Sequence, residues 1–153
     1  MGAERYISSR TWVDPADGLP WLKSRPYFVS REHQKELRES MHARGFRVVE
    51  AEVSTDVDDV EAALLVELTS KLEFSALGAG SWAAYRDRLW DLQMSENEPP
   101  VAVAIVGLDN LVPTRLHDFV RAVHNLLSMT EAVGLSDDRA DLQIEYFFIG
   151  DWS

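Results

Sequence analysis

The chain has 153 residues, of which 46% are hydrophobic, and this suits one globular domain with a buried core. Its formal net charge of −11 argues against a nucleic-acid or anionic-membrane surface, because both surfaces need clustered Lys and Arg. The absence of cysteine excludes disulfides, thiolate metal sites and cysteine nucleophiles, and together with the lack of an apolar signal core it favours a cytoplasmic location.

The acidic residues are unevenly distributed. Residues 1–47 carry nine basic and six acidic residues, whereas residues 48–153 carry six basic and twenty acidic ones. The densest stretch, residues 50–73, has eight acids and one lysine. Such a stretch is typical of a solvated helix face that aids solubility, and it also offers a negative surface to a basic partner.

In chain order the sequence predicts an N-terminal arm followed by alternating strands and helices. The arm, residues 1–26, is rich in Pro, Gly and Trp without a regular period, and we expect its Trp12 and Trp21 to pack on the body. Short apolar runs predict strands over residues 27–29, 46–53, 101–106 and 142–149. Apolar residues three and four positions apart predict helices over residues 31–44, about 55–70, 81–94 and 113–134.

Capping residues and apolar stripes predict where the helices end and which faces they bury. Ser30 is the expected N-cap of the first helix and Gly45 its stop. Ser54 and Thr55 are expected caps of the second helix, since Thr55 and Asp58 resemble a capping box. The stripes expected to be buried are Leu37 and Met41; Val57, Val60, Leu64 and Leu68; and Leu116, Phe119, Val120, Val123 and Leu127.

The order of elements predicts the fold class. The run Val-Ala-Val-Ala-Ile-Val at residues 101–106 is typical of a strand covered on both faces. Strands that alternate with helices favour an α/β fold with a small, mostly parallel β-sheet flanked by α-helices. We expect residues 1–45 to form an arm with an extra strand and helix packed on the body, and residues 46–153 to form the main domain.

Residues 80–92, Gly-Ser-Trp-Ala-Ala-Tyr-Arg-Asp-Arg-Leu-Trp-Asp-Leu, are the most informative segment. Three large aromatic residues and two aspartates recur there at helical spacing. Tyr85 and Leu89 share a stripe that we expect to be buried, and Asp87 and Asp91 lie together on another side. A helix that is apolar in its body and anionic at its tip suits the basic cleft of another protein.

This segment and the order of elements resemble the barstar family, small α/β proteins that inhibit secreted ribonucleases inside the cell that produces them. The resemblance covers roughly residues 46–149. In that family a strand and a helix lead to a loop and a second helix with a pattern like F-P-x-Y-F-G-x-N-W-D-A-L-W-D-x-L-x-D-L. The positions that this chain shares with the pattern are Phe74, Trp82, Ala84, Asp87, Leu89, Asp91 and Leu92.

The resemblance implies an intracellular inhibitor of the immunity or antitoxin type, which occludes the active site of a basic secreted ribonuclease or related toxin from the same organism. It implies no catalysis, no cofactor, no metal and no direct contact with nucleic acid or a membrane. A ribonuclease holds its phosphodiester with Arg, Lys and His, so a carboxylate on a rigid helix can occupy the phosphate site. Asp87 stands at the matching position.

The partner-binding residues that the resemblance implies are Gly80, Ser81, Trp82, Ala83, Arg86, Asp87, Asp91 and, late in the last helix, Glu131. Trp82 suits the core as well as the interface. Ala83 stands where the family usually has an acid, and Arg86 stands where an aromatic residue is common. These departures imply a partner whose surface differs from that of the family's usual target.

Two other function classes stay open. A receiver-like or small-ligand α/β domain would use Asp109, just after the apolar strand, as a phosphoacceptor or metal carboxylate. A receiver also needs an acid cluster after its first strand and a Lys after its last, but Glu50 and Glu52 lie within a predicted strand and no Lys follows Lys71. An acidic mimic of nucleic acid would spread its contacts over residues 56–67 instead of around Asp87.

The residues that could support catalysis form no recognised motif. His117 and His124 lie seven positions apart, and with Asp118 they lack the spacing of a metal or acid–base site. Capping and turns explain the adjacent carboxylates at 58–59 and 137–138. The phosphate-binding, dinucleotide-binding and nucleophile-elbow motifs do not occur. The sequence therefore predicts that the protein is not an enzyme.

Overall fold

The computed structural model describes residues 12–94, 98–134 and 142–152, so the predicted acidic pair at 137–138 lies outside the described residues. The strands are β1 (Tyr27–Ser30), β2 (Arg47–Glu52), β3 (Val101–Val106) and β4 (Ile144–Gly150). They form one parallel sheet in the order β1-β4-β3-β2. The predicted α/β fold with a parallel sheet is confirmed.

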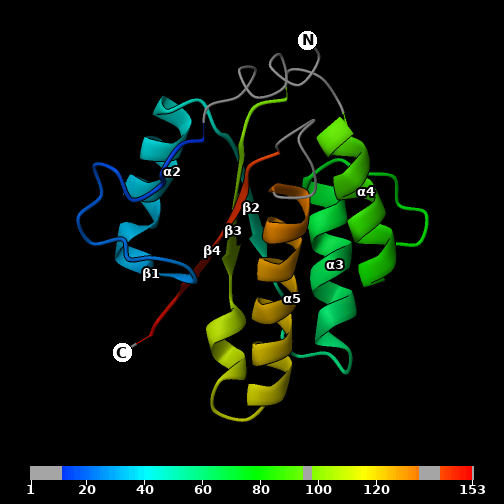
Figure 1. Cartoon of the computed structure of the whole chain (residues 1–153). Helices are drawn as coiled ribbons and strands as arrows, with labels where there is room; N and C mark the ends of the chain where they lie inside the picture. The colour runs from blue at the N-terminus through cyan, green and yellow to red at the C-terminus, as the bar shows by residue number, and fades with distance from the viewer. Residues whose placement is uncertain (1–11, 95–97, 135–141, 153) are drawn as a thin grey trace.

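Helices cover both faces of this sheet (Figure 1). The helical elements are the 3-10 turns η1 (Arg31–His33) and η2 (Leu108–Leu111) and the helices α2 (Gln34–Ala43), α3 (Val60–Lys71), α4 (Trp82–Met94) and α5 (Leu116–Gly134). Figure 1 shows the sheet nearly edge-on, with α2 on one side and α3, α4 and α5 on the other. No helix among the described residues has both the length and the apolar character that a membrane crossing requires.

The sheet separates two hydrophobic cores. The larger core lies between the sheet and α3, α4 and α5, and it includes Leu64, Leu68, Leu89 and Leu126. The smaller core lies under α2 and the arm, where Leu37 and Met41 pack with residues of β1, β3 and β4. Every residue of β4 is buried, because this central strand is covered on both faces.

The N-terminal segment is part of the same sheet. β1 pairs in parallel with β4, with Tyr27 opposite Phe147, and α2 then leads to β2 at the far edge. The predicted strand at 27–29 and the predicted burial of Leu37 and Met41 are confirmed. Residues 27–45 therefore contribute a strand, a helix and part of the smaller core.

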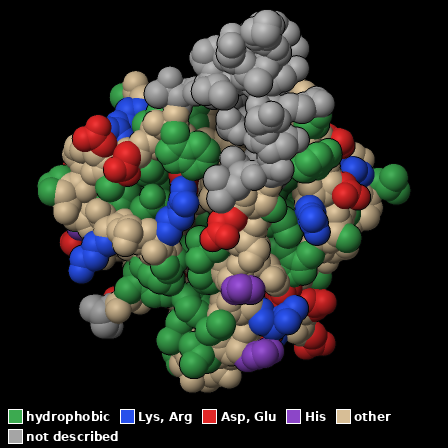
Figure 2. Space-filling model, viewed as in Figure 1, with side chains coloured by type: hydrophobic (Ala, Val, Ile, Leu, Met, Phe, Trp, Pro, Cys, Tyr) green, Lys and Arg blue, Asp and Glu red, His purple; other side chains and the backbone are tan. Residues whose placement is uncertain are grey.

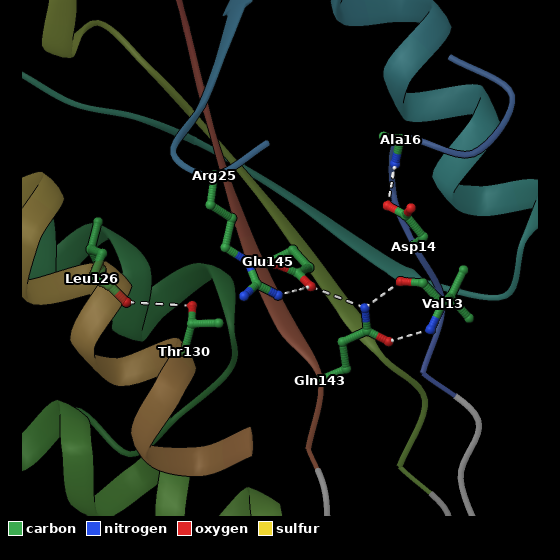
Figure 3. Close-up of polar contacts among 8 residues, drawn as sticks. All are labelled: Val13, Asp14, Ala16, Arg25, Leu126, Thr130, Gln143 and Glu145. Atoms are coloured by element: carbon green, nitrogen blue, oxygen red, sulfur yellow. Dashed lines mark hydrogen bonds and ion pairs between the residues drawn. The ribbon is translucent and has the colours of Figure 1, made fainter. Parts of the chain in front are cut away.

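A buried polar network joins the arm to β4 (Figure 3). The carboxylate of Glu145 is fully buried and accepts hydrogen bonds from Arg25 Nε at 2.9 Å and Nη2 at 2.8 Å. Gln143 Nε2 donates to Glu145 at 3.0 Å and to the carbonyl of Val13 at 2.6 Å, and Gln143 Oε1 accepts from the amide of Val13 at 3.0 Å. These bonds hold the arm across the amino end of the strand.

The predicted packing of the arm's tryptophans is half right. Trp21 stacks on His33, with ring centroids 4.2 Å apart, and its indole donates to Glu36 at 2.9 Å. Trp12 is exposed instead, and its ring lies 5.9 Å from the guanidinium of Arg25. The Arg25 guanidinium lies over a Trp12 ring that remains 46% exposed, an arrangement that sequence periodicity could not indicate.

The predicted start of the second helix is wrong. Asp59 is the N-cap of α3, since its carboxylate accepts from the amide of Ala62 at 3.0 Å. The segment before it stays non-helical because Arg115 donates to the carbonyls of Val57 at 2.6 Å and Asp58 at 2.8 Å. Val57 is accordingly exposed, whereas Val60, Leu64 and Leu68 are buried as expected.

The first helix and the last helix also differ in detail from the predictions. Ser30 makes no side-chain cap bond, because the chain enters α2 through the 3-10 turn η1. In α5, Leu116 and Val120 are 54% and 53% exposed, contrary to the predicted stripe. The buried face of α5 is rotated towards Ala122 and Leu126, which contact the sheet.

Candidate partner-binding surface

The helix that carries the sequence motif, α4, begins after a glycine-rich turn. Gly78 and Gly80 have φ angles of 75° and 97°, a backbone region that favours glycine. Gly80 also lies close to α3, since a Cβ there would be 3.7 Å from the Cβ of Ala62. Ser81 accepts a hydrogen bond from the amide of Ala84 at 3.4 Å, and α4 then runs from Trp82 to Met94.

One narrow seam of α4 is buried. Tyr85, Leu89 and Gln93 are the buried residues of this helix, so the predicted core positions of Tyr85 and Leu89 are confirmed. The hydroxyl of Tyr85 lies 2.6 Å from that of Tyr146 on β4. Burial raises the pKa of both tyrosines well above the ordinary value, so both rings remain neutral at physiological pH. This contact joins α4 directly to the central sheet.

The outer face of α4 carries an open hollow. Ala83, Arg86, Asp87 and Trp90 line it, and Trp90 is 45% exposed. Among the described residues Asp87 forms no hydrogen bond or ion pair, and Arg88 donates instead to the carbonyl of Leu77 at 3.2 Å. The hollow therefore presents a carboxylate, an exposed indole and a guanidinium to an incoming molecule.

The other predicted partner-binding residues do not line this hollow. Trp82 is half-buried, donates its indole N–H to Glu61 at 2.9 Å and packs edge-on against Tyr85 at 6.4 Å. Asp91 is exposed on α4 and Glu131 is exposed late in α5. Gly80 and Ser81 form the turn that precedes the helix. The structure thus brings together Ala83, Arg86 and Asp87 of the predicted set.

Many acids of the 50–73 stretch have partners within the chain. Glu50 pairs with Arg38 at 2.9 Å, Glu61 with Arg121 at 2.9 Å, and Glu73 with Arg47 at 3.3 Å. Burial raises the pKa of Glu50, but hydrogen bonds from Arg38 and Gln34 outweigh it and lower the pKa below its ordinary value. Figure 2 shows acidic side chains beside basic ones over the helical layer.

Asp109, the alternative candidate, lies at the carboxyl end of the sheet. Its side chain is largely buried, accepts from the amide of Asp151 at 3.0 Å and lies 3.5 Å from Arg31 Nη2. It also packs closely on Gly150, where a Cβ would lie 2.7 Å from the Asp109 Cγ. Within the described ranges, no three His, Cys, Asp or Glu residues are grouped to hold a metal ion. The side chain of Asp109 therefore packs against and hydrogen-bonds to the chain at the carboxyl end of β4.

Glu61 has a role that the sequence did not indicate, because it lies within an acidic stretch typical of a solvated helix face. Glu61 accepts hydrogen bonds from Trp82, Arg121 and Asn125, which belong to two other helices. A tryptophan near the start of a helix needs a partner for its N–H when it is partly buried, and this was the available signal.

Comparisons of the chain with protein-family models, with curated proteins and with solved structures found no match.

Proposed function

We propose that this protein is a barstar-like inhibitor, which binds a basic ribonuclease or related toxin and occludes its active site with α4. The observation that carries the proposal is the hollow on α4, where Asp87 offers a carboxylate that has no partner among the residues that the structure describes. The buried side of the same helix is fixed by Tyr85 and Leu89. A partner would therefore meet a carboxylate on a supported helix.

The element order supports the proposal. From residue 47 to residue 150 the chain runs strand, helix, loop, helix, strand, helix, strand. This is the order that the resemblance to the barstar family implies. The motif helix of that pattern corresponds to α4, and its shared aspartate corresponds to Asp87.

The chemistry of inhibition follows from the accessibility of Asp87. An enzyme that cleaves a phosphodiester gathers Arg, Lys and His around the phosphate, and a carboxylate can accept strong, charge-assisted hydrogen bonds from that set. The net charge of −11 adds long-range attraction to a basic partner. Arg86 lies beside Asp87 in the hollow, so the partner needs an acceptor or a negative group opposite Arg86.

The two alternative functions have less support. A nucleic-acid mimic needs free acids over residues 56–67, but Glu61 is paired with Arg121 and Asp59 caps α3. A phosphoacceptor needs an accessible carboxylate, but Asp109 is packed against Gly150 and bonded to Asp151. Neither arrangement favours these functions over inhibition.

The test of the proposal is capture followed by titration. Immobilised protein is incubated with extract and culture medium from the native organism, and any captured nuclease is assayed for RNA cleavage against increasing inhibitor. We expect a 1:1 complex, loss of cleavage, and weaker inhibition as salt rises. Failure to capture a nuclease, or capture of one that remains fully active, would contradict the proposal.

A further inference from the structure

The fully buried seam of α4 is narrow. Tyr85, Leu89 and Gln93 are the buried residues of this helix and lie four residues apart, while Trp82 and Leu92 are partly buried against the same core. The preceding turn is exposed, and Leu77 within it is 80% exposed. A rotation of α4 about this seam would move the hollow and the Asp87 carboxylate, so the start of the helix needs a separate anchor.

Glu61 on α3 provides this anchor. Its Oε1 accepts from the indole of Trp82 at 2.9 Å, at the first residue of α4. Its Oε2 accepts from Arg121 Nε of α5 at 2.9 Å, and Asn125 donates to Oε1 at 3.4 Å. The side chain of Glu61 is 18% exposed. One carboxylate thus connects α3, α4 and α5 at the start of α4.

The contacts continue from Trp82 into the sheet. The rings of Trp82 and Tyr85 are nearly perpendicular, at 82°, and the Tyr85 hydroxyl is bonded to Tyr146. Trp82 is therefore held at its polar end by Glu61, and its ring contacts Tyr85, which is bonded to β4. Ala83 and Arg86, which line the hollow, lie one and four residues after Trp82 on the same helix.

We propose that Glu61 is a positioning residue, which acts through Trp82 to fix the orientation of the α4 surface that carries Asp87. This inference rests on the proposed function for its biological meaning. Its physical basis is preorganisation: a surface already held in its bound orientation loses less entropy on association. Glu61 need not touch the partner for this effect.

The first test uses the free protein. Amide hydrogen exchange is measured for the full chain and for the variants Glu61→Ala, Trp82→Phe and the double variant. We expect exchange at residues 85–88, whose amides follow the unbonded first turn, to accelerate about tenfold in each single variant, with β4 and α2 unchanged. The double variant should exchange like either single variant, because each change breaks the same hydrogen bond between Trp82 and Glu61.

A conservative variant and a matched control complete this test. Glu61→Gln keeps an oxygen acceptor for Trp82, so it should restore most of the protection that Glu61→Ala loses. Glu67→Ala removes another α3 acid, which accepts a hydrogen bond from the amide of Glu52 at 3.4 Å, and it should leave α4 unchanged. Unchanged exchange in α4, or equal acceleration along the whole chain, would overturn the positioning role.

The second test uses the captured nuclease. If Glu61 positions the docking surface, Glu61→Ala and Trp82→Phe should each raise the inhibition constant about tenfold, without an additive effect in the double variant. Faster α4 exchange with an unchanged inhibition constant would overturn the link between positioning and inhibition. If no nuclease is inhibited, the proposed function fails, while the exchange result alone still decides whether Glu61 positions α4.

Discussion

Glu145 shows how a single buried charge is accommodated in this molecule. Its carboxylate has no exposed surface, and it is satisfied by two hydrogen bonds from Arg25 and one from Gln143. A buried ion pair adds little net stability over apolar residues, but loss of one partner leaves an uncompensated charge. The side chain of Arg25 is 37% exposed, so water can partly replace it.

Arg25→Ala should therefore lower the free energy of unfolding by about 2–4 kcal/mol. This is somewhat less than the cost of breaking a fully buried ion pair, because Arg25 is partly exposed. The matched control is Arg38→Ala, which removes an exposed partner of Glu50 and should cost less than about 1 kcal/mol. Urea unfolding at neutral pH measures both values. Equal costs for the two arginines would show that the Glu145 network does not hold the arm as described.

At the scale of elements, the strands followed from sequence and the helix details did not. Short apolar runs predicted β3 and β4 to within two residues, because a strand covered on both faces needs such a run. The start of α3 depends on Arg115, which donates hydrogen bonds to the carbonyls of Val57 and Asp58. These two residues lie 58 and 57 positions earlier in the chain. No local pattern encodes such a contact.

The candidate site also has one part that the sequence predicted and another part that it did not. Sequence periodicity was sufficient to separate the buried Tyr85 and Leu89 from the outward-facing Asp87, because all three lie on one regular helix. The composition of the hollow, with Trp90 beside Asp87, and the bond from Glu61 to Trp82 depend on side-chain directions and on packing between helices. They became apparent only in three dimensions.

The tyrosine pair between α4 and β4 predicts a pH dependence. Burial raises the pKa of Tyr85 and Tyr146 above the ordinary value of 10.0, so the folded state retains protons that the unfolded chain releases. The contribution of the pair to the free energy of unfolding should be constant below this pH and should fall as the pH rises beyond it. The free energy of unfolding, measured from about pH 8 to about pH 11.5, below and above the ordinary pKa of tyrosine, tests this expectation.

The double variant Tyr85→Phe/Tyr146→Phe is the control for this dependence. Replacing both hydroxyls together leaves no unsatisfied partner, so its stability at neutral pH should lie within about 1.5 kcal/mol of the parent. Its loss of stability at high pH should be shallower, although Tyr27, whose pKa burial also raises, still contributes. Identical pH profiles for parent and variant would contradict the role assigned to the pair.

At the scale of the whole molecule, different elements cover the two faces of the sheet. α2 and the arm cover one face, while α4 with its hollow lies in the layer on the other (Figure 1). The main domain expected at residues 46–153 shares its sheet with β1, and it leaves Ala102, Ala104 and Phe147 in a core completed by residues before 46.

A chain of residues 46–153 alone should therefore fail to unfold cooperatively, because one face of its sheet would be exposed and Glu145 would lose Arg25. Thermal unfolding followed by near-UV circular dichroism tests this expectation, with the full chain under the same conditions as the reference. A cooperative transition with a native-like spectrum would show that the N-terminal 45 residues are dispensable for folding.

The most direct test of the central claim compares two variants, each of which replaces one acidic residue with alanine and so changes the net charge equally. Asp87→Ala removes the carboxylate in the hollow, and Glu39→Ala removes an exposed acid of α2, on the opposite side of the sheet. The inhibition constant against the captured nuclease is measured for both. We predict an increase of at least about tenfold for Asp87→Ala and less than about twofold for Glu39→Ala. Equal, small effects of the two changes would contradict the claim that Asp87 is the centre of the inhibitory surface.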